Sequence, residues 1–453
     1  MHLTGIILLI FNFVRVYAKF RLNVDQKTLS TASSAVNYPS NSLANYQTFS
    51  SLKHTGYSVR FVRPTLCDSD LQQYSGYLDL GQDVHYYFWF FESKKEPASK
   101  PLTRALARKW ALQGGEEHDE HRLQSLQLDT GFEYAFSRPG TGFSYGAKMN
   151  IARNSQLFYD AIQLFYEAFP QYSPLPFHLF GESFAGRYIP VYSDYIVKRN
   201  KQEVLKIPIE SIGIGNGWIN PLIQFQYGST MACDSSYGQL LSQLACDRMK
   251  KAYVTCSSLV KKCYEKDSAL SCVRADNYCT NNIDGVFSLS KRSYYDVRKE
   301  EDVVEPPQDF INLLNQPDMK RKIGAADMLF EECADAPYVA ISSTGESARQ
   351  SSTAIESLLN SGIRFLNYVG DADYLCNWYG NYALTLNLTH DEAGLFTAQS
   401  LRSWNYQNKE VGQIQMTNRL AFVRVYEAGH EVPYYQPEVA LAMFDNWVNK
   451  KPF

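Results

Sequence analysis

Short apolar runs alternate with amphipathic stretches along most of the chain. Two aromatic-rich runs at residues 73–80 and 84–92 flank Gly81-Gln82-Asp83, a pattern that predicts a β-hairpin. The apolar spacing over residues 151–169 has the period of an amphipathic helix. Further strands are predicted at 177–180, 207–214, 363–369 and 420–426. Strands that alternate with helices in this way predict an α/β fold with a mostly parallel central sheet covered on both faces by helices.

The first residues predict a signal peptide. The chain is apolar from Gly5 to Val14 and then reaches Val16-x-Ala18, which suits cleavage after Ala18. A membrane anchor is the alternative, but the run is short for a span of about 20 residues. Residues 19–57 are rich in Ser, Asn and Thr, and we interpret them as a pro-segment or loose N-terminal arm. The folded domain is expected to cover residues 58–453.

Composition narrows the class of protein. Of the 453 residues, 44 are Lys or Arg and 47 are Asp or Glu, which gives a net charge of −3. Such a balance argues against nucleic-acid binding, and the 45% of hydrophobic residues excludes global disorder. Aromatic residues make up 14%, enough for a large core or an aromatic-lined cleft.

The chain has nine cysteines, and six of them lie between residues 233 and 279. A zinc cluster is the rival interpretation, but the spacing contains no CxxC pair and no histidine lies among them. Behind a signal peptide, disulfides are favoured, and the odd number leaves at least one cysteine without a partner. The stretch of about 222–340 breaks the α/β rhythm, so we expect it to be an insertion of cysteines and polar loops above the sheet.

The string FHLFGESFAGRYIP, residues 177–190, predicts a nucleophile elbow. An apolar strand runs into Gly181-Glu182-Ser183-Phe184-Ala185-Gly186 and then into a predicted helix. Small residues at 181 and 185 allow a sharp turn that exposes Ser183 at the carboxyl end of the strand.

Two further strand ends carry candidate catalytic side chains in the order that an α/β-hydrolase needs, Ser then Asp then His. Asp371 and Asp373 follow the strand at 363–369, and His430 follows the strand at 420–426. Each alone could be an ordinary loop residue. Three matches in the right order favour a catalytic triad.

The strings FGESFAGRYIP, IGIGNGWINP, YVGDADYLCNWYGN and YEAGHEVPYYQPEVAL together resemble the serine carboxypeptidases of the carboxypeptidase Y type. The resemblance implies an α/β-hydrolase fold with Ser183 as nucleophile, His430 as general base and Asp373 as the orienting acid. It also implies that the backbone N–H of Phe184 contributes to the oxyanion hole.

The same resemblance implies that Glu182 binds the C-terminal carboxylate of the substrate. Two carboxylates can pair only if they share a proton, so an acidic working pH is expected. Glu431 falls where the family lines the pocket for the leaving residue, which suggests a preference for basic residues. The expected substrates are the C-termini of peptides or proteins, and no cofactor, metal, nucleic acid or membrane partner is expected.

For the cysteines, the resemblance implies the disulfides Cys233–Cys246, Cys256–Cys279 and Cys263–Cys272, and a free thiol at Cys376. The sequon at Asn387 could carry a glycan. The expected location is the secretory pathway, with the vacuole or the extracellular space as its end.

The resemblance is interrupted between about residues 103 and 139. The family has a Trp-x-Asn-Gly-Gly-Pro-Gly-Cys-Ser-Ser loop where this chain reads RALARKWALQGGEEHDEH. That loop supplies a second oxyanion N–H, and losing one such donor typically costs about 100- to 1,000-fold in turnover. A central strand is also expected to be lost here. His118 and His121 could bind a metal but fit a solvated helix face better.

The interruption leaves Cys333 without its family partner, for which Cys67 could substitute. Either the protein has diverged here, or the segment is translated in a wrong frame or through an intron; the abrupt edges favour the second explanation. Three alternative functions follow from these observations: a catalytically impaired relative, an acyltransferase that uses the same triad, and an esterase or lipase.

Overall fold

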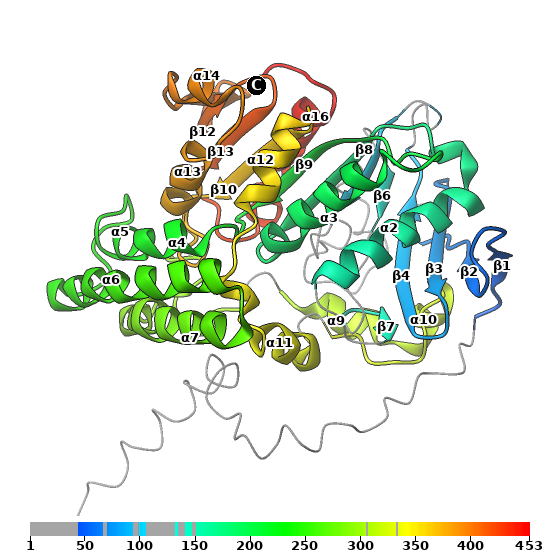
Figure 1. The fold of residues 1–453 in the computed structure, drawn as a ribbon, viewed down its shortest axis with the longest axis horizontal. Helices are drawn as coiled ribbons and strands as arrows, with labels where there is room; N and C mark the ends of the chain where they lie inside the picture. Colours follow the sequence, from blue (N-terminus) through cyan, green and yellow to red (C-terminus); the bar gives the residue numbers. More distant parts are fainter. Residues whose placement is uncertain are drawn as a thin grey trace, which may run out of the picture. The chain divides into compact units, whose positions relative to one another are not determined.

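A mixed β-sheet forms the centre of the compact unit Asn41–Phe453 (Figure 1). The computed structural model describes residues 44–66, 70–93, 98, 100–105, 132–134, 141–146, 151–304, 307–331 and 334–453. Across the sheet, the described strands are β1 (Gln47–Ser50), β2 (Tyr57–Val62), β3 (Gln73–Leu80), β4 (Val84–Phe91), β6 (Phe132–Tyr134), β5 (Leu102–Ala105), β8 (Phe177–Glu182), β9 (Ile209–Gly215), β10 (Arg364–Gly370), β13 (Leu420–Val425), β12 (Lys409–Met416) and β11 (Arg402–Tyr406), with β7 (Tyr145–Gly146) beside β4.

The sheet is parallel at its centre and antiparallel at both sides. Strands β6, β5, β8, β9, β10 and β13 run parallel to one another. The ladders from β1 to β4 and from β11 to β12, and the pairs β4–β6 and β12–β13 that join them to this block, are antiparallel. The expectation of a mostly parallel sheet therefore holds for the part that carries the candidate catalytic residues. The predicted hairpin is confirmed as β3 and β4.

The expected loss of a central strand is wrong. Strands β5 and β6 lie between β4 and β8, and the register pairs Leu102 with Phe177 and with Phe132. The two strands are short, with 4 and 3 residues, and they lack the β-branched run that would have identified them. Ladder partners on both sides supply what local propensity does not.

Regular structure begins earlier than residue 58. Strand β1 pairs in antiparallel fashion with β2, with Gln47 opposite Phe61 and Ser50 opposite Ser58. Its residues are mostly exposed polar ones, so the hydrophobic pattern gave no sign of a strand. Residues 1–43, which include the predicted signal peptide, lie outside the described residues.

Helices cover both faces of the sheet. Successive residues of a strand point to opposite faces, so Leu179 packs in one core while Phe180 packs in another. The first core lies under α2, α3 and α12, which lie on the same face in Figure 1; the second includes Phe444 and Trp447 of α16. The described helices are α2 (Ile151–Ala168), α3 (Ala185–Arg199), α4 (Pro221–Gln224), α5 (Gly228–Cys233), α6 (Gln243–Lys266), α7 (Ala269–Cys279), α8 (Gly285–Phe287), α9 (Asp309–Leu314), α10 (Pro317–Lys322), α11 (Asp335–Ser342), α12 (Ser352–Asn360), α13 (Trp378–Leu386), α14 (Ala393–Thr397), α15 (Val432–Tyr435) and α16 (Pro437–Val448).

The insertion is helical, which corrects the expectation of polar loops. Helix α6 has 24 residues and packs beside α7 (Figure 1). Its buried residues Cys246, Met249, Ala252, Cys256 and Val260 recur every three or four positions, which is the helical period. Cys246, Cys256 and Cys263 lie on this buried face of α6 and are joined to cysteines of α5 and α7. The disulfides are Cys233–Cys246, Cys256–Cys279 and Cys263–Cys272, the three that the resemblance implies.

Within the described ranges, no helix combines the length and apolar character needed to cross a membrane.

Candidate active site

Ser183 lies at the turn between β8 and α3, on a backbone that L-residues rarely adopt. Its φ is 60°, the left-handed region. Its N–H donates to the carbonyl of Gly215 (2.9 Å), and its carbonyl accepts from the N–H groups of Gly186 (3.0 Å) and Trp218 (2.9 Å). A Cβ on Gly186 would lie 2.9 Å from the Trp218 backbone, so only glycine allows this approach. The turn leaves Ser183 half-buried at the end of the strand, as a nucleophile elbow requires.

His430 and Asp373 form a buried pair at the carboxyl ends of two adjacent parallel strands. The loops after β10 and β13 carry them, and the His430 Nδ1 lies 2.7 Å from the Asp373 Oδ2. The exposed fraction is 0% for Asp373 and 6% for His430. Ser183 follows β8, two strands away in the same parallel block. The fold therefore brings the three predicted triad residues to one edge of the sheet.

Asp373 is held in place by three hydrogen-bond donors. The Asn216 Nδ2 donates to its Oδ2 (2.8 Å), as does the Cys376 backbone N–H (3.2 Å), and the Leu375 N–H donates to its Oδ1 (2.9 Å). Hydrogen bonds of this kind fix the carboxylate and therefore the ring of His430.

Burial and nearby negative charge act in opposite directions on the pKa of His430. Burial, the largest single effect, lowers it, but the charge and hydrogen bond of Asp373 and the charges of Glu182 and Glu431 raise it by more in sum. Together they raise the pKa of His430 to about 9. An imidazolium formed during catalysis is therefore stabilised, which is the role expected of the acid in a triad.

Asp371, the other aspartate of the motif, faces a different set of groups. Its carboxylate accepts from the Tyr237 hydroxyl (2.6 Å), from the Arg424 Nη2 (3.1 Å) and from the backbone N–H of Glu427 (2.9 Å). The structure thus pairs His430 with Asp373, the aspartate that the resemblance implies.

Two half-buried glutamates lie close enough to His430 to act on its charge. Glu182 ends β8 immediately before Ser183, and its charge also raises the pKa values of Tyr368 and Cys376. Glu431 follows His430 directly. Both carboxylates therefore belong to the electrostatic surroundings of the candidate active site.

Cys376 is buried and is a free thiol. Burial, with Asp373 next, raises the pKa of Cys376 well above its usual value. Ligand atoms of Asp373, Cys376 and His430 lie within 4.8 Å of one another. Metal binding would need the thiolate, which this environment disfavours, so the three residues fit a triad with a neighbouring thiol better than a metal centre.

Sequence reasoning missed two residues that support the histidine and aspartate. Asn216, fully buried with a φ of 41°, joins Asp373 to the N–H of Gly370 through its side chain. The carbonyl of Tyr295 accepts from the His430 N–H (2.8 Å), and the two rings lie 5.1 Å apart. Asn216 could have been found from the sequence, because Gly215-Asn216-Gly217 stands at the end of a predicted strand. Tyr295 could not, because it belongs to the insertion and no local pattern predicts its contact with His430.

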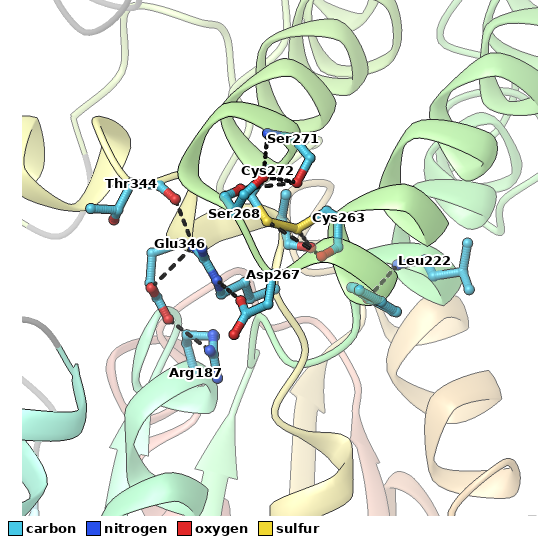
Figure 2. Close-up of a disulfide and its surroundings, with 12 residues drawn as sticks. Arg187, Leu222, Cys263, Asp267, Ser268, Ser271, Cys272, Thr344 and Glu346 are labelled. Atoms are coloured by element: carbon cyan, nitrogen blue, oxygen red, sulfur yellow. Dashed lines mark hydrogen bonds and ion pairs between the residues drawn. A yellow bond between two sulfur atoms is a disulfide. The ribbon is translucent and has the colours of Figure 1, made fainter.

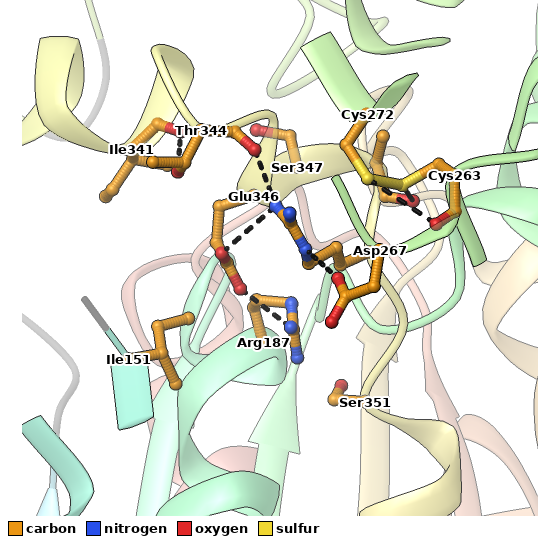
Figure 3. Close-up of polar contacts among 12 residues, drawn as sticks. Ile151, Arg187, Cys263, Asp267, Cys272, Ile341, Thr344, Glu346, Ser347 and Ser351 are labelled. Carbon is orange, nitrogen blue, oxygen red and sulfur yellow. Dashed lines mark hydrogen bonds and ion pairs between the residues drawn. A yellow bond between two sulfur atoms is a disulfide. The ribbon is translucent and has the colours of Figure 1, made fainter. Parts of the chain in front are cut away.

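A chain of charged side chains ties the elbow helix to the insertion (Figures 2 and 3). The Arg187 Nη2 in the first turn of α3 lies 2.6 Å from the Glu346 Oε1. Arg349 lies 3.5 Å from the other oxygen of Glu346, and its Nε lies 2.7 Å from the Asp267 Oδ1, beside the Cys263–Cys272 disulfide. These contacts hold the insertion against the element that positions Ser183.

Several residues singled out in the sequence lie outside the described residues. These are Cys67, Cys333 and the segment 106–131, which contains His118 and His121. The place where the family has its second oxyanion donor falls within that segment. Phe184 precedes the first residue of α3, where backbone N–H groups have no partner within the helix. Asn387, the predicted glycosylation site, is exposed after the last residue of α13, and its Nδ2 donates to the carbonyl of Ala383 (2.8 Å).

Known proteins share this architecture and these motifs. A family model described as serine carboxypeptidase matches residues 64–106 and 137–450, and thus omits the interrupted segment. Carboxypeptidase S1 of Penicillium janthinellum is 32% identical over 84% of this chain and 96% of its own length. The vacuolar serine-type carboxypeptidase ATG42 of Saccharomyces cerevisiae is 32% identical over 89% of this chain and 85% of its own length.

Two further comparisons concern length and fold. Carboxypeptidase Y of Schizosaccharomyces pombe is 31% identical over 84% of this chain, which spans only 42% of that protein. The crystal structure of KEX1(DELTA)P, a prohormone-processing carboxypeptidase from Saccharomyces cerevisiae, superposes with a TM-score of 0.71 and 20% identity, over 86% of this chain and 94% of the other.

The parallel sheet, the elbow and the ordered strand-end residues define an α/β-hydrolase. Within that class, the matched motifs extend from the first hairpin to the last helix. The chain belongs to the serine carboxypeptidase family.

Proposed function

We propose that this protein is a serine-type carboxypeptidase that releases C-terminal residues through an acyl-enzyme on Ser183. The observation that carries the proposal is a buried His430–Asp373 pair and a serine held at positive φ, all at strand ends of one parallel block. His430 accepts the proton of the Ser183 hydroxyl as its Oγ attacks the scissile carbonyl, and the N–H of Phe184 stabilises the oxyanion. The C–N bond then breaks as His430 returns the proton to the leaving amine, and water hydrolyses the ester by the same steps.

A fluorophosphonate that labels only activated serines tests this proposal directly. We expect stoichiometric labelling at Ser183, no labelling of Ser183→Ala, and release of single C-terminal residues from a peptide. Labelling of Ser183 without release of C-terminal residues would favour the alternative of a catalytically impaired relative. That alternative is supported by residues 107–136, which the family model does not match. No labelling of the folded wild-type chain would contradict the proposal.

We further propose that Glu182 binds the substrate carboxylate through a shared proton. The pair then holds one proton and one negative charge, so binding the substrate carboxylate adds no second negative charge near His430, whose pKa the charge of Glu182 already raises. We expect KM for a peptide to rise from pH 5 to pH 8, because deprotonation breaks the pair. In Glu182→Gln this rise should disappear. A KM that is flat over this range in the wild type would contradict the role of Glu182.

Glu431 is proposed to favour a basic leaving residue, because its carboxylate stands next to His430, where the leaving residue departs. Peptides ending in Lys should turn over faster than matched peptides ending in Leu, by about 5- to 30-fold for an ion pair of roughly 1–2 kcal/mol. Glu431→Gln should remove the difference between the two peptides, while any change in the pKa of His430 affects the turnover of both alike. Equal turnover of the two peptides by the wild type would eliminate the proposal.

The location is proposed to be the secretory pathway, ending in the vacuole or outside the cell. Three buried disulfides indicate an oxidising compartment, and one relative is named as vacuolar.

A further inference from the structure

We infer that Asp371 is a positioning residue, which holds the loop that carries His430 against the loop that carries Asp373. The position of the Asp371 carboxylate depends in turn on its hydrogen bond with Tyr237 of the insertion. The inference rests on the proposed function, since it concerns the residues proposed to carry it out. Asp371 itself contacts neither Ser183 nor His430 in the described structure. Its carboxylate instead binds three elements that meet beside them.

The first step is the contact between the two loops. The Asp371 N–H donates to the carbonyl of Val425 (3.0 Å), and the Ala372 N–H donates to the carbonyl of Ala428 (2.9 Å). A Cβ on Gly370 would lie 2.1 Å from the carbonyl oxygen of Gly429, so the two backbones touch without an intervening side chain. A shift of the residues after β10 is therefore transmitted directly to the residues that precede His430.

The second step is the strained residue that the Asp371 carboxylate stabilises. Glu427 has a φ of 53°, a conformation that residues other than glycine rarely adopt. Its N–H donates to the Asp371 Oδ1 (2.9 Å). Such strain persists only where the surroundings hold it, and here a buried carboxylate does so three residues before His430. Without that acceptor, the turn is expected to relax and to move the imidazole.

The third step is the charge balance. The Arg424 Nη2 donates to the Asp371 Oδ2 (3.1 Å), and the guanidinium lies over the rings of Trp378 (4.0 Å) and Tyr426 (5.0 Å) from their centroids. Burial raises the pKa of Asp371, and the hydrogen bonds from Tyr237 and Arg424 offset part of that rise. Arg424 and Asp371 therefore give each other a counter-charge at this buried position.

The fourth step links this carboxylate to the insertion. Tyr237 lies within the segment closed by the Cys233–Cys246 disulfide, where a bridge between Ser235 and Gly238 makes a tight turn. The turn presents the Tyr237 hydroxyl to the Asp371 Oδ1 at 2.6 Å. A hydrogen bond to a buried ionised group is among the stronger ones. The disulfide-closed turn therefore acts on the geometry of the active site through one phenol.

The variants Asp371→Asn and Tyr237→Phe test the inference, with Tyr253→Phe as the matched control. The Tyr253 hydroxyl also lies in the insertion and donates to the carbonyl of Leu222 (2.7 Å), away from the catalytic loops. We expect kcat to fall about 100-fold in Asp371→Asn and about 10-fold in Tyr237→Phe, with KM within about 3-fold, because small displacements of catalytic groups cost this much. Tyr253→Phe should match the wild type.

A second readout does not depend on activity. The low-field proton resonance of the His430 Nδ1–H, which reports the hydrogen bond to Asp373, should shift in both Asp371→Asn and Tyr237→Phe but not in Tyr253→Phe. If Asp371→Asn does not fold, Tyr237→Phe alone decides, since it removes one hydroxyl and no charge. Wild-type kcat with an unshifted resonance in Tyr237→Phe, or an equal loss in Tyr253→Phe, would overturn the inference. An inactive, unlabelled wild type would refute the proposed function, while the resonance comparison would still test this inference.

Discussion

Replacing Asp373 with asparagine is expected to lower kcat about 10⁴-fold without unfolding the protein, as loss of the orienting acid does in other serine triads. The asparagine would keep the shape of the side chain, but its amide could present an N–H where His430 now finds an acceptor at 2.7 Å. The imidazole would then be held in the wrong tautomer for taking the Ser183 proton. Steady-state kinetics on a peptide substrate, with fluorophosphonate labelling rates beside them, measure the loss.

Asp79→Asn is the matched control, because Asp79 is also a buried aspartate paired with a histidine. Its Oδ1 lies 2.5 Å from the Nδ1 of His85, in the β3–β4 hairpin away from Ser183. This variant should keep kcat within about 3-fold, since the partners of Asp79, His85 on β4 and Arg60 on β2, lie away from the catalytic loops. A kcat for Asp373→Asn within about tenfold of the wild type would contradict the triad assignment.

The substitution Asp373→Asn should also change how the stability of the protein depends on pH. The pKa of His430 in the fold, about 9, lies above its ordinary value of 6.5. The buried ion pair therefore contributes its full stability below pH 6.5 and loses it as the pH rises through about 9. Urea unfolding of the wild type should show this decline. In Asp373→Asn the decline should vanish, because burial alone lowers the pKa of His430.

The second large change in kcat is expected when the family's Gly-Gly-Pro-Gly-Cys loop is introduced into this chain. A chimera whose residues 107–131 are replaced by the family's Gly-Gly-Pro-Gly-Cys segment with its flanks is expected to raise kcat about 100- to 1,000-fold, the usual worth of one oxyanion donor. Strands β5 and β6 border the exchange, and both have ladder partners that the chimera keeps. Turnover of the two chains on one peptide measures the gain.

Changing the loop cysteine of the chimera to serine separates the two effects of the exchange. This control keeps the oxyanion N–H but not a disulfide to Cys333, so it should retain the gain in kcat and lose only stability. A chimera that folds but turns over no faster than the chain as written would show that the second donor comes from elsewhere. Sequencing the mature transcript over codons 95–145 is the companion measurement: a transcript that encodes the loop would make the chimera the natural protein.

Elements whose pattern lies within a short stretch of the sequence could be predicted from that stretch alone. The elbow at Ser183 combines a short apolar strand, small residues and a helix start, and the helix at Ile151–Ala168 has a clear apolar stripe. The preference for Asp373 over Asp371 came from family resemblance, because both residues follow the same strand. Only the fold shows that one carboxylate faces His430 and the other faces Arg424.

What could not be predicted depends on partners far along the chain. Asn216 meets Asp373 across 157 positions, and β5 is stabilised by ladders on both sides despite its poor local propensity. In the insertion, the cysteines were interpreted only as disulfide partners. The helical spacing that Cys246, Cys256 and Cys263 share with Met249 and Val260 was not recognised. In each case, tertiary contacts override or complete a weak local pattern.

Strand β1 limits how far the chain can be shortened from its N-terminus without uncovering β2. Four residues, Gln47–Ser50, cover the outer edge of β2, and their own outward side chains are largely polar. A protease that cleaved after Ser50 would uncover the β2 backbone and leave its N–H and C=O groups open to pairing with another molecule. A chain shortened past Ser50 is therefore expected to aggregate more readily, through the exposed edge of β2, than a chain shortened before Gln47.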